Sequence, residues 1–184
     1  GLDTQEKIDE FFNPDYEGDI HDPLLFADMG KAVERIFAAI QTGQKIMVHG
    51  DYDADGVTSS VIMVSVLKKL AAVFGAAGEA DDRIDIFIPH RELDGYGLKE
   101  KNILEFAKAG VNLIITVDCA TSNVREVQLA SEQGMEVIIT DHHRAGHALP
   151  AAYAMINPNV PGEPYPFKFL SGAGVAFKVA QALI

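Results

Sequence analysis

The sequence predicts an α/β protein with a doubly wound, mostly parallel sheet of five strands and helices on both faces. Two observations predict this fold class. Short apolar segments rich in β-branched residues alternate along the chain with longer segments of helical periodicity. Each of the first four apolar segments also runs directly into a cluster of polar residues, as strands do at the ligand-binding edge of an open α/β sheet.

The alternation defines the elements in order. Residues 57–74 are apolar nearly all round, which predicts a helix that is buried on every side. Residues 1–30 show only turn signals, residues 75–82 form an acidic surface loop, and residues 158–166 form a proline-rich arm. The predicted strands cover residues 45–48, 84–88, 111–117, 136–140 and 153–156. The predicted helices cover residues 31–40, 57–74, 98–109, 123–133 and 172 onward.

Composition excludes several classes of protein. The 184 residues include 15 Lys and Arg against 27 Asp and Glu, a net charge of −12, which excludes a basic nucleic-acid coat protein or a polybasic membrane binder. The single cysteine, Cys119, excludes an internal disulfide and a cysteine-cage metal site. The apolar run at residues 61–67 is too short to span a bilayer, and no signal peptide is visible, so we expect a cytoplasmic protein.

The ends of the chain suggest a larger protein. The sequence starts at Gly1 rather than methionine, and it stops at Ile184 inside an apolar helical pattern. We expect residues 1–184 to be one domain of a longer protein, cut at both ends.

Polar residues follow the predicted strands at the point where each strand ends. Because the carboxyl ends of parallel strands lie on one edge of a sheet, we expect these side chains to meet in one crevice. The clusters are residues 49–56 after the first strand, His90-Arg91-Glu92 after the second, Asp118-Cys119 after the third, Asp141-His142-His143 after the fourth, and Asn157 with Asn159 after the fifth.

Such a group of carboxylates requires a cation, because like charges a few ångströms apart raise each other's pKa. Carboxylate with imidazole suits Mn²⁺ or Mg²⁺, with Zn²⁺ less favoured. Residues 49, 51, 53 and 55 would point to one side if that segment is extended, so two ions could share the site. Two ions about 4 Å apart are the usual arrangement for displacement at phosphorus.

Two other interpretations are open. Asp and Gly after a strand are common turn residues, and a lone His49 or His90 is often only hydrogen-bonded or solvated. A receiver-like acidic pocket for phosphorylation would explain Asp53, Asp55 and Asp118. That pocket leaves the two adjacent histidines after the fourth strand without a role.

At these residues the sequence resembles the DHH phosphoesterase superfamily, and within it the RecJ-like single-strand-specific exonucleases. The resemblance runs in order over nearly the whole chain. The matching segments are residues 50–59, Pro89-His90-Arg91, residues 95–98, Thr116-Val117-Asp118-Cys119, Thr140-Asp141-His142-His143, Ile156-Asn157-Pro158 and residues 172–178. One departure is Ala120, which stands where the family usually has glycine.

The resemblance implies a role for each polar residue. Asp118 would bridge two ions, and Asp118, Asp141, His142 and His143 would form the catalytic group. His143 would contact the metal centre or the substrate phosphate, and Asp141 would orient a neighbouring histidine. Asp51 would be structural or would support the ligands from behind, rather than bind the metal itself. The implied metal ligands are His49, Asp53, Asp55, Asp118 and His142.

The resemblance also implies an activity. RecJ-like enzymes are Mn²⁺- or Mg²⁺-dependent hydrolases that degrade single-stranded DNA from the 5′ end to mononucleotides, in DNA repair and recombination. A helicase and a single-strand-binding protein are expected partners. The family carries a further metal-binding aspartate and a second, DHH-associated domain downstream, so we expect this piece to be weak or inactive alone.

Substrate contacts are predicted from residues near the strand ends. Arg91 directly follows a strand, and Arg144 and Lys178 are further candidates for phosphate. Tyr96 could stack on a base. Free backbone N–H groups at Gly172 and Gly174, where a helix opens, could hold a phosphate, although close packing explains the same glycines.

The net charge of −12 conflicts with direct binding of long DNA, which draws on Lys and Arg. One alternative is therefore a phosphoesterase for short oligonucleotides, cyclic dinucleotides or pyrophosphate. Another is a non-catalytic replication scaffold on the same fold, which the presence of Asp53, Asp55, Asp118 and His142 disfavours.

Overall fold

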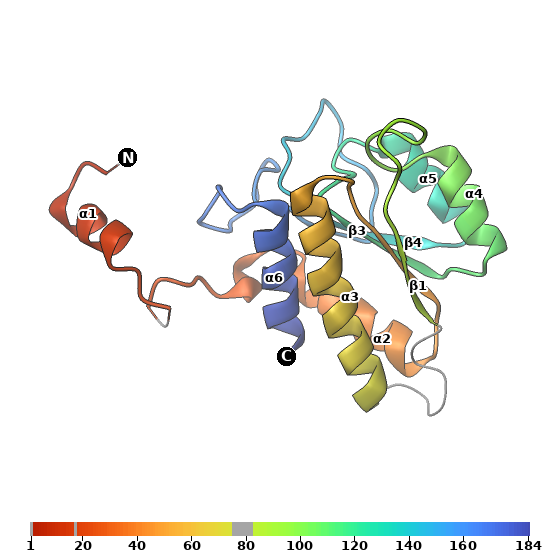
Figure 1. Ribbon diagram of the computed structural model, residues 1–184, viewed down its shortest axis with the longest axis horizontal. Coiled ribbons are helices and arrows are strands. Elements are labelled where there is room, and N and C mark those ends of the chain that lie inside the picture. The colour runs from red at the N-terminus through yellow and green to blue at the C-terminus, as the bar shows by residue number, and fades with distance from the viewer. Residues whose placement is uncertain (1, 17, 75–82) are drawn as a thin grey trace.

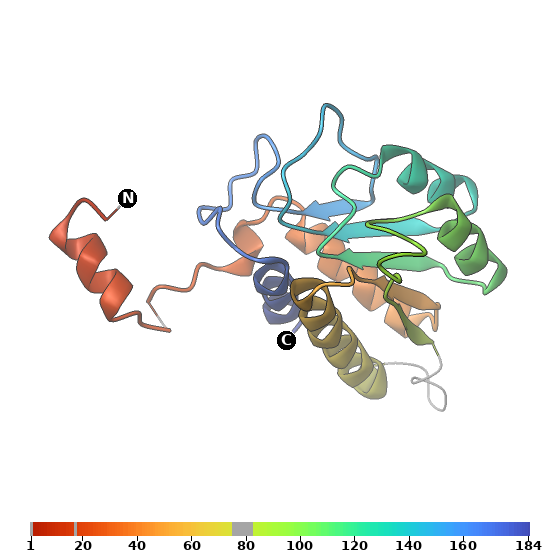
Figure 2. The same ribbon diagram turned by 45° about the horizontal axis from the view of Figure 1, so that its top comes forward.

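The computed structural model describes residues 2–16, 18–74 and 83–184, and it contains a five-stranded sheet. All strand pairs are parallel and the strand order is β2-β1-β3-β4-β5. Figure 2 shows the strands running in the same direction. The predicted fold class is confirmed. The strands are β1 (Ile46–His49), β2 (Ile84–Phe87), β3 (Leu113–Val117), β4 (Glu136–Thr140) and β5 (Ala154–Ile156).

Helices cover both faces of the sheet (Figure 1). Buried residues of α2, α3 and α6 pack on one face, and those of α4 and α5 pack on the other. The helices are α1 (Gln5–Phe12), α2 (Met29–Gln41), α3 (Ala54–Phe74), α4 (Glu100–Lys108), α5 (Val124–Glu132) and α6 (Gly172–Leu183), with a short 3₁₀ helix η1 (Pro23–Leu25). The sheet is therefore wound on both sides, and its strand ends form a shared edge.

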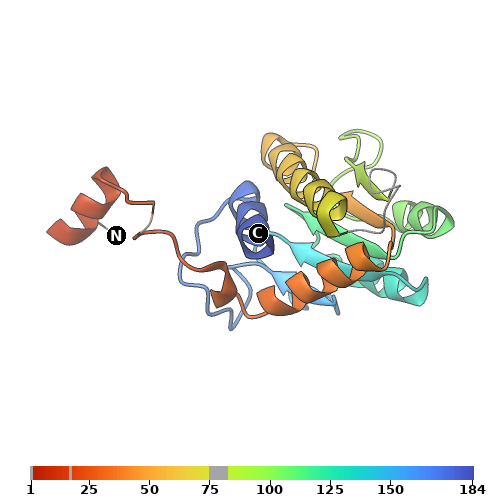
Figure 3. The same ribbon diagram turned by 90° about the horizontal axis from the view of Figure 1, so that it is seen from below.

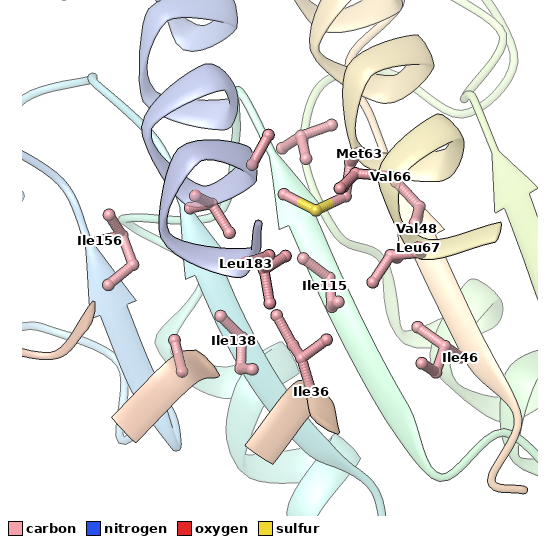
Figure 4. Packing of buried hydrophobic residues seen from close by; sticks show 14 of the residues in the cluster. Ile36, Ile46, Val48, Met63, Val66, Leu67, Ile115, Ile138, Ile156 and Leu183 are labelled. Carbon is pink, nitrogen blue, oxygen red and sulfur yellow. The ribbon is translucent and has the colours of Figure 1, made fainter. Parts of the chain in front are cut away.

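The central strands are apolar throughout because both faces are covered. In β3, Ile115 points to the core beneath α3 and α6, whereas Ile114 points to the core beneath α4 and α5. Figure 4 shows Met63 and Leu67 of α3 packed close to Ile115. This two-sided burial explains a continuous apolar strand in place of an alternating one.

Helix α3 differs from the prediction, because only one of its faces is buried. Leu67 is fully buried, whereas Val61 is 58% exposed. By length and composition α3 is the one helix of the described part of the chain that could cross a membrane, a test that a core helix also passes. Here α3 packs against α6 and the first three strands. The buried face consists of Gly56, Ser59, Ser60, Met63, Val66, Leu67, Leu70 and Ala71.

The first thirty residues contain two elements that the sequence did not predict, helix α1 and the short 3₁₀ helix η1. Helix α1 begins after Thr4, whose hydroxyl accepts a hydrogen bond from the N–H of Lys7, but none of its residues is buried. In Figures 1 and 3 it lies apart from the sheet. Helix α2 begins at Met29, two residues before the predicted start. The predicted acidic loop at residues 75–82 lies outside the described residues.

The one-sided burial of α3 predicts a contrast between two truncations. Leu67→Ala should lower the free energy of unfolding by about 3 kcal/mol, because it leaves a cavity in the core. Val61→Ala should change it by less than about 0.5 kcal/mol, because Val61 faces outward. Urea unfolding of both variants checks this. Equal losses would mean that the outer face of α3 is covered as well.

Candidate metal centre

Side chains from the ends of β1, β3 and β4 meet at one edge of the sheet. Two groups of three side chains could each hold a metal ion, and Asp118 belongs to both. Within each group, the donor atoms lie within 4.8 Å of one another. The predicted meeting of Asp53, Asp118 and the His142–His143 pair is therefore observed. The first group is Asp118, His142 and His143, and the second is Asp51, Asp53 and Asp118.

Asp118 occupies the position between the two groups. It follows β3 directly with φ +61°, a left-handed conformation that Asp tolerates better than most residues. Its side chain is 1% exposed. Burial, together with the nearby charges of Asp55 and Asp53, raises the pKa of Asp118 to about 8. The carboxyl group is thus costly to ionise without a cation.

His142 faces two of the carboxylates. Its Nε2 lies 3.1 Å from Oδ1 of Asp118 and 3.6 Å from Oδ2 of Asp55. The His142–Asp118 contact is not aligned as a hydrogen bond, so Oδ1 of Asp118 has no hydrogen-bond donor within the described part of the chain. Nε2 of His142 therefore lies near one oxygen of each carboxylate, although Asp55, a predicted metal ligand, is in neither donor group found in the described residues.

Asp55 is held in place by the N-terminus of α6. Its Oδ2 accepts a hydrogen bond from the N–H of Gly172, and its Oδ1 accepts one from the N–H of Ala173, both at 2.7 Å. A helix N-terminus favours a negative charge. These bonds join residues 117 and 118 positions apart and fix the carboxylate beside His142.

The prediction of free amides for phosphate at Gly172 and Gly174 is wrong. The N–H of Gly172 is taken by Asp55, and the N–H of Gly174 donates to the capping hydroxyl of Ser171 at 3.2 Å. A Cβ at Gly172 would collide with the carboxylate of Asp118. Close approach of α6 to Asp118 therefore explains Gly172, in agreement with the packing alternative.

The condition that residues 49–55 are all extended is not met, because α3 begins at Ala54. Asp53 caps this helix, and its Oδ1 accepts a hydrogen bond from the N–H of Gly56 at 2.9 Å. Asp51 is buried in the second donor group, and its Oδ1 has no hydrogen-bond partner among the described residues. Asp51 thus lies among the possible metal ligands, whereas a structural or supporting role was expected.

His49 is fully buried in apolar surroundings. Its ring centroid lies 5.3 Å from that of Phe87 and 6.2 Å from that of Phe106, and its Nδ1 lies 3.7 Å from Sγ of Cys119. Burial lowers the pKa of His49 to about 4, so it is neutral at pH 7. Neither donor group found in the described residues includes His49.

His143 is oriented by Asp141. Its Nδ1 lies 2.7 Å from Oδ1 of Asp141, and the hydroxyl of Tyr96 lies 3.1 Å from the same nitrogen. Burial alone would raise the pKa of Asp141, but hydrogen bonds from His143 and Thr121 outweigh burial and lower it. The bond to Asp141 in turn raises the pKa of His143. Because a carboxylate only accepts, Nδ1 carries the hydrogen and Nε2 is the nitrogen left for other partners.

The predicted cationic residues lie in different places. Arg91 is exposed after β2, and its guanidinium stacks over the ring of Tyr52 at 4.7 Å, beside the polar cluster of residues 49–56. Arg144 is exposed just after His143. The prediction that Lys178 contacts phosphate is wrong. Lys178 is buried, and its Nζ donates to the carbonyl of His21 at 2.6 Å and to Gln181 at 2.9 Å. Lys178 therefore anchors the N-terminal segment to α6.

Sequence reasoning missed the support that Thr121 gives to the site. Its N–H and its hydroxyl both donate to Oδ2 of Asp141, at 3.0 and 2.6 Å. Asn157 and Asn159 were singled out only by their place after the fifth strand, yet their amides reach the carbonyls of the two histidines. A threonine three residues after Asp118 carries no signal of its own, because its partner comes from another loop.

The donor set fits divalent cations. Two buried carboxylate oxygens, Oδ1 of Asp51 and Oδ1 of Asp118, have no hydrogen-bond donor within the described ranges. Burial raises the pKa of both groups. Carboxylate oxygens with an imidazole nitrogen are suitable ligands for Mn²⁺ and, with more oxygen, for Mg²⁺. A cation would compensate both unpaired oxygens at once.

Residues 45–183 match the family model described as the DHH family, N-terminal domain. The chain belongs to the DHH family. It is 44% identical over 184 residues to the single-stranded-DNA-specific exonuclease RecJ of Bacillus subtilis (strain 168), covering all of this chain and 22% of that protein. The DHH chain thus spans about a fifth of the length of this relative.

Solved structures of manganese-bound RecJ are similar to this DHH chain. One, of exonuclease RecJ bound to manganese, has 35% sequence identity and a TM-score of 0.75, and the match covers 89% of this chain and 39% of that one. Another, of RecJ from Thermus thermophilus in complex with Mn²⁺, has 33% identity and a TM-score of 0.67, covering 86% and 21%. The fold and the expected metal thus agree with these relatives.

The crowding around Asp118 predicts a pH-dependent gain in stability. In the metal-free chain at pH 8, Asp118→Asn should raise the free energy of unfolding by up to about 5 kcal/mol. The pKa of Asp118 rises from its ordinary 3.8 to about 8 on folding, so the unsubstituted chain loses stability as pH rises through this window. Asparagine carries no charge and tolerates the positive φ. The difference should therefore shrink toward pH 4.

Urea unfolding in EDTA at pH 4, 6 and 8 measures this effect. Asp85→Asn is the matched control, because Asp85 is an exposed residue of β2. If Asp118→Asn were less stable than the unsubstituted chain at pH 8, the cost of ionising this buried carboxyl group would not be the dominant effect at the site.

Proposed function

We propose that this chain is the metal-binding domain of a two-metal exonuclease that hydrolyses single-stranded DNA from the 5′ end. The observation that carries the proposal is the pair of donor groups that share Asp118. The similarity to RecJ proteins, which are named single-stranded-DNA-specific exonucleases and have structures with manganese, supports the same activity.

In this proposal, Asp118 would contribute to both metal positions, because it belongs to both donor groups. His142 would hold one ion with it, and Asp55, whose Oδ2 lies 3.6 Å from Nε2 of His142, is a further candidate there from outside the donor group. Asp51 and Asp53 would hold the other, and His49 is a candidate from outside both groups. Two divalent ions held in this way would supply an activated water and offset the charge on the phosphoryl oxygens.

The remaining side chains bind and orient the phosphodiester. His143 offers Nε2 toward a phosphate oxygen, because its Nδ1 is engaged with Asp141. Arg91, held over Tyr52, brings a guanidinium to the edge of the site and can pair with a phosphate. The 3′ oxygen of the departing nucleotide is the leaving group, and a 5′-mononucleotide is the product.

The acidic charge of the chain requires a contribution from elsewhere. Two divalent ions would change the net charge from −12 to −8, which still leaves no basic surface for a long strand. Residues 1–184 would be a single DHH domain of a longer protein, and a downstream DHH-associated domain would supply basic surface and a further aspartate. A helicase and a single-strand-binding protein as partners, and a cytoplasmic location, stay predictions from the resemblance.

The second candidate is a DHH phosphoesterase for short oligonucleotides, cyclic dinucleotides or pyrophosphate. The observation that favours it is the same acidic charge of the chain. Arg91, stacked over Tyr52 in the polar cluster of residues 49–56, is the cation available for a small phosphate substrate. A small substrate needs few phosphate contacts, so it would not require a basic groove. The chemistry at Asp118 would be unchanged.

A nuclease assay tests the proposal. A full-length protein that carries this chain should release mononucleotides from the 5′ end of long single-stranded DNA in the presence of Mn²⁺. It should leave blunt-ended duplex DNA intact. Asp118→Asn should lower the rate at least about 100-fold, because it removes the shared carboxylate. Asp85→Asn should leave the rate unchanged.

The two candidates separate by substrate length. Release of mononucleotides from a 5′-labelled long strand supports the exonuclease. Hydrolysis of cyclic dinucleotides or dinucleotides with the long strand left intact supports the small-substrate enzyme. Tight DNA binding without any cleavage would leave only the scaffold alternative.

A further inference from the structure

A buried polar network lies directly behind the two histidines, and the proposed chemistry does not use it. Asn157, at the end of β5, is fully buried. Its Nδ2 donates to Oγ1 of Thr121 at 2.8 Å, and Thr121 donates from both its hydroxyl and its N–H to Oδ2 of Asp141. Asp141 then bonds to Nδ1 of His143. A continuous path of hydrogen bonds therefore runs from β5 to the ring of His143.

The same asparagine also holds the backbone of the histidine pair. Nδ2 of Asn157 lies 2.9 Å from the carbonyl oxygen of His143, and Nδ2 of Asn159 lies 2.6 Å from that of His142. The N–H of Asn159 donates to Oδ1 of Asn157 at 2.8 Å, which ties the two asparagines together. Both carbonyls of the turn are thus fixed by side chains from one segment.

We propose that Asn157, Asn159 and Thr121 are positioning residues that set the placement of His142 and His143 against Asp118. This inference rests on the proposed metal-binding function. The histidines lie after β4, outside regular secondary structure, so no ladder of backbone bonds fixes them. Their two carbonyls and the ring of His143 are instead held by the network, which leaves Nε2 of His142 at 3.1 Å from Asp118.

The geometry favours positioning over simple fold stability. The side chains of Asn157, Asn159 and Thr121 bond to the histidine turn, to Asp141 or to one another, and none of the three lies in either donor group. Groups that orient metal ligands from behind typically contribute ten- to hundredfold to metal affinity. A buried bond that served only the fold would affect unfolding and leave the metal affinity of the folded chain unchanged.

The test compares Mn²⁺ affinity with stability in a full-length protein that carries this chain, because the proposed downstream aspartate is then present. Thr121→Val keeps the shape of the side chain but removes the hydroxyl, and Thr121→Ser restores it. Asn159→Ala removes the bond to the carbonyl of His142. Asn112→Ala is the control, because Asn112 accepts one bond from the N–H of Lys45 at the opposite edge of the sheet. Calorimetric titration with MnCl₂ gives the Kd, and urea unfolding in EDTA gives the metal-free stability.

We expect Thr121→Val and Asn159→Ala to raise the Kd for Mn²⁺ by about 10- to 100-fold. Thr121→Ser and Asn112→Ala should change the Kd for Mn²⁺ by less than about twofold. Thr121→Ser keeps the hydroxyl, and the bond that Asn112→Ala removes lies far from the metal centre. If Thr121→Val fails to fold, Asn159→Ala decides alone, because Asn159 is only partly buried.

The outcomes separate the inference from the function on which it rests. If the unsubstituted full-length protein binds Mn²⁺ but Thr121→Val and Asn159→Ala bind it equally well, the positioning inference is overturned. The same holds if Asn112→Ala weakens binding as much as Asn159→Ala. If the unsubstituted full-length protein binds no Mn²⁺, the proposed metal-binding function itself fails.

Discussion

The burial of several carboxyl groups at one sheet edge is the constraint on which the rest of the structure depends. Asp118 is buried with its Oδ1 unpaired, and Asp51 has an unpaired oxygen beside it. A fold that only needed stability would place apolar or hydrogen-bonded groups there, since an unpaired buried carboxylate costs several kcal/mol. The parallel topology brings the strand ends together, and a divalent cation is the counter-charge that suits this donor set.

Helix α6 is the part of the fold that accommodates this crowding. Its first two amides bind Asp55, so one of the acidic groups is compensated within the chain. The same end of the helix approaches Asp118 so closely that only glycine fits at position 172. The helix therefore stabilises one carboxylate while excluding other side chains from the space around the second.

Local sequence was sufficient for the sheet and for the identity of the site edge. β-branched runs such as that of β3 form strands wherever both faces are covered, and their carboxyl ends must then meet. Helix α1 was missed although Ile8, Phe11 and Phe12 have helical spacing, because the helix has only eight residues and buries none of them. The amide of Gly172 was assigned to phosphate because its partner, Asp55, lies 117 residues away. The surroundings of His49 likewise depend on Phe87 and Phe106, which only the folded sheet brings to it.

The site combines carboxylate oxygens that have no hydrogen-bond donor with a surrounding network of side chains that do have hydrogen-bond partners. The unpaired oxygens of Asp51 and Asp118 are costly to ionise in the absence of a cation, because burial raises the pKa of both groups. Asn157 and Asp141 have hydrogen-bond partners within the network, so the backbone behind the histidines resists displacement. A preorganised site binds its ion without first ordering its ligands, which lowers the entropic cost of binding. The hydrogen-bonded network thus makes it possible for the fold to keep these carboxyl groups together.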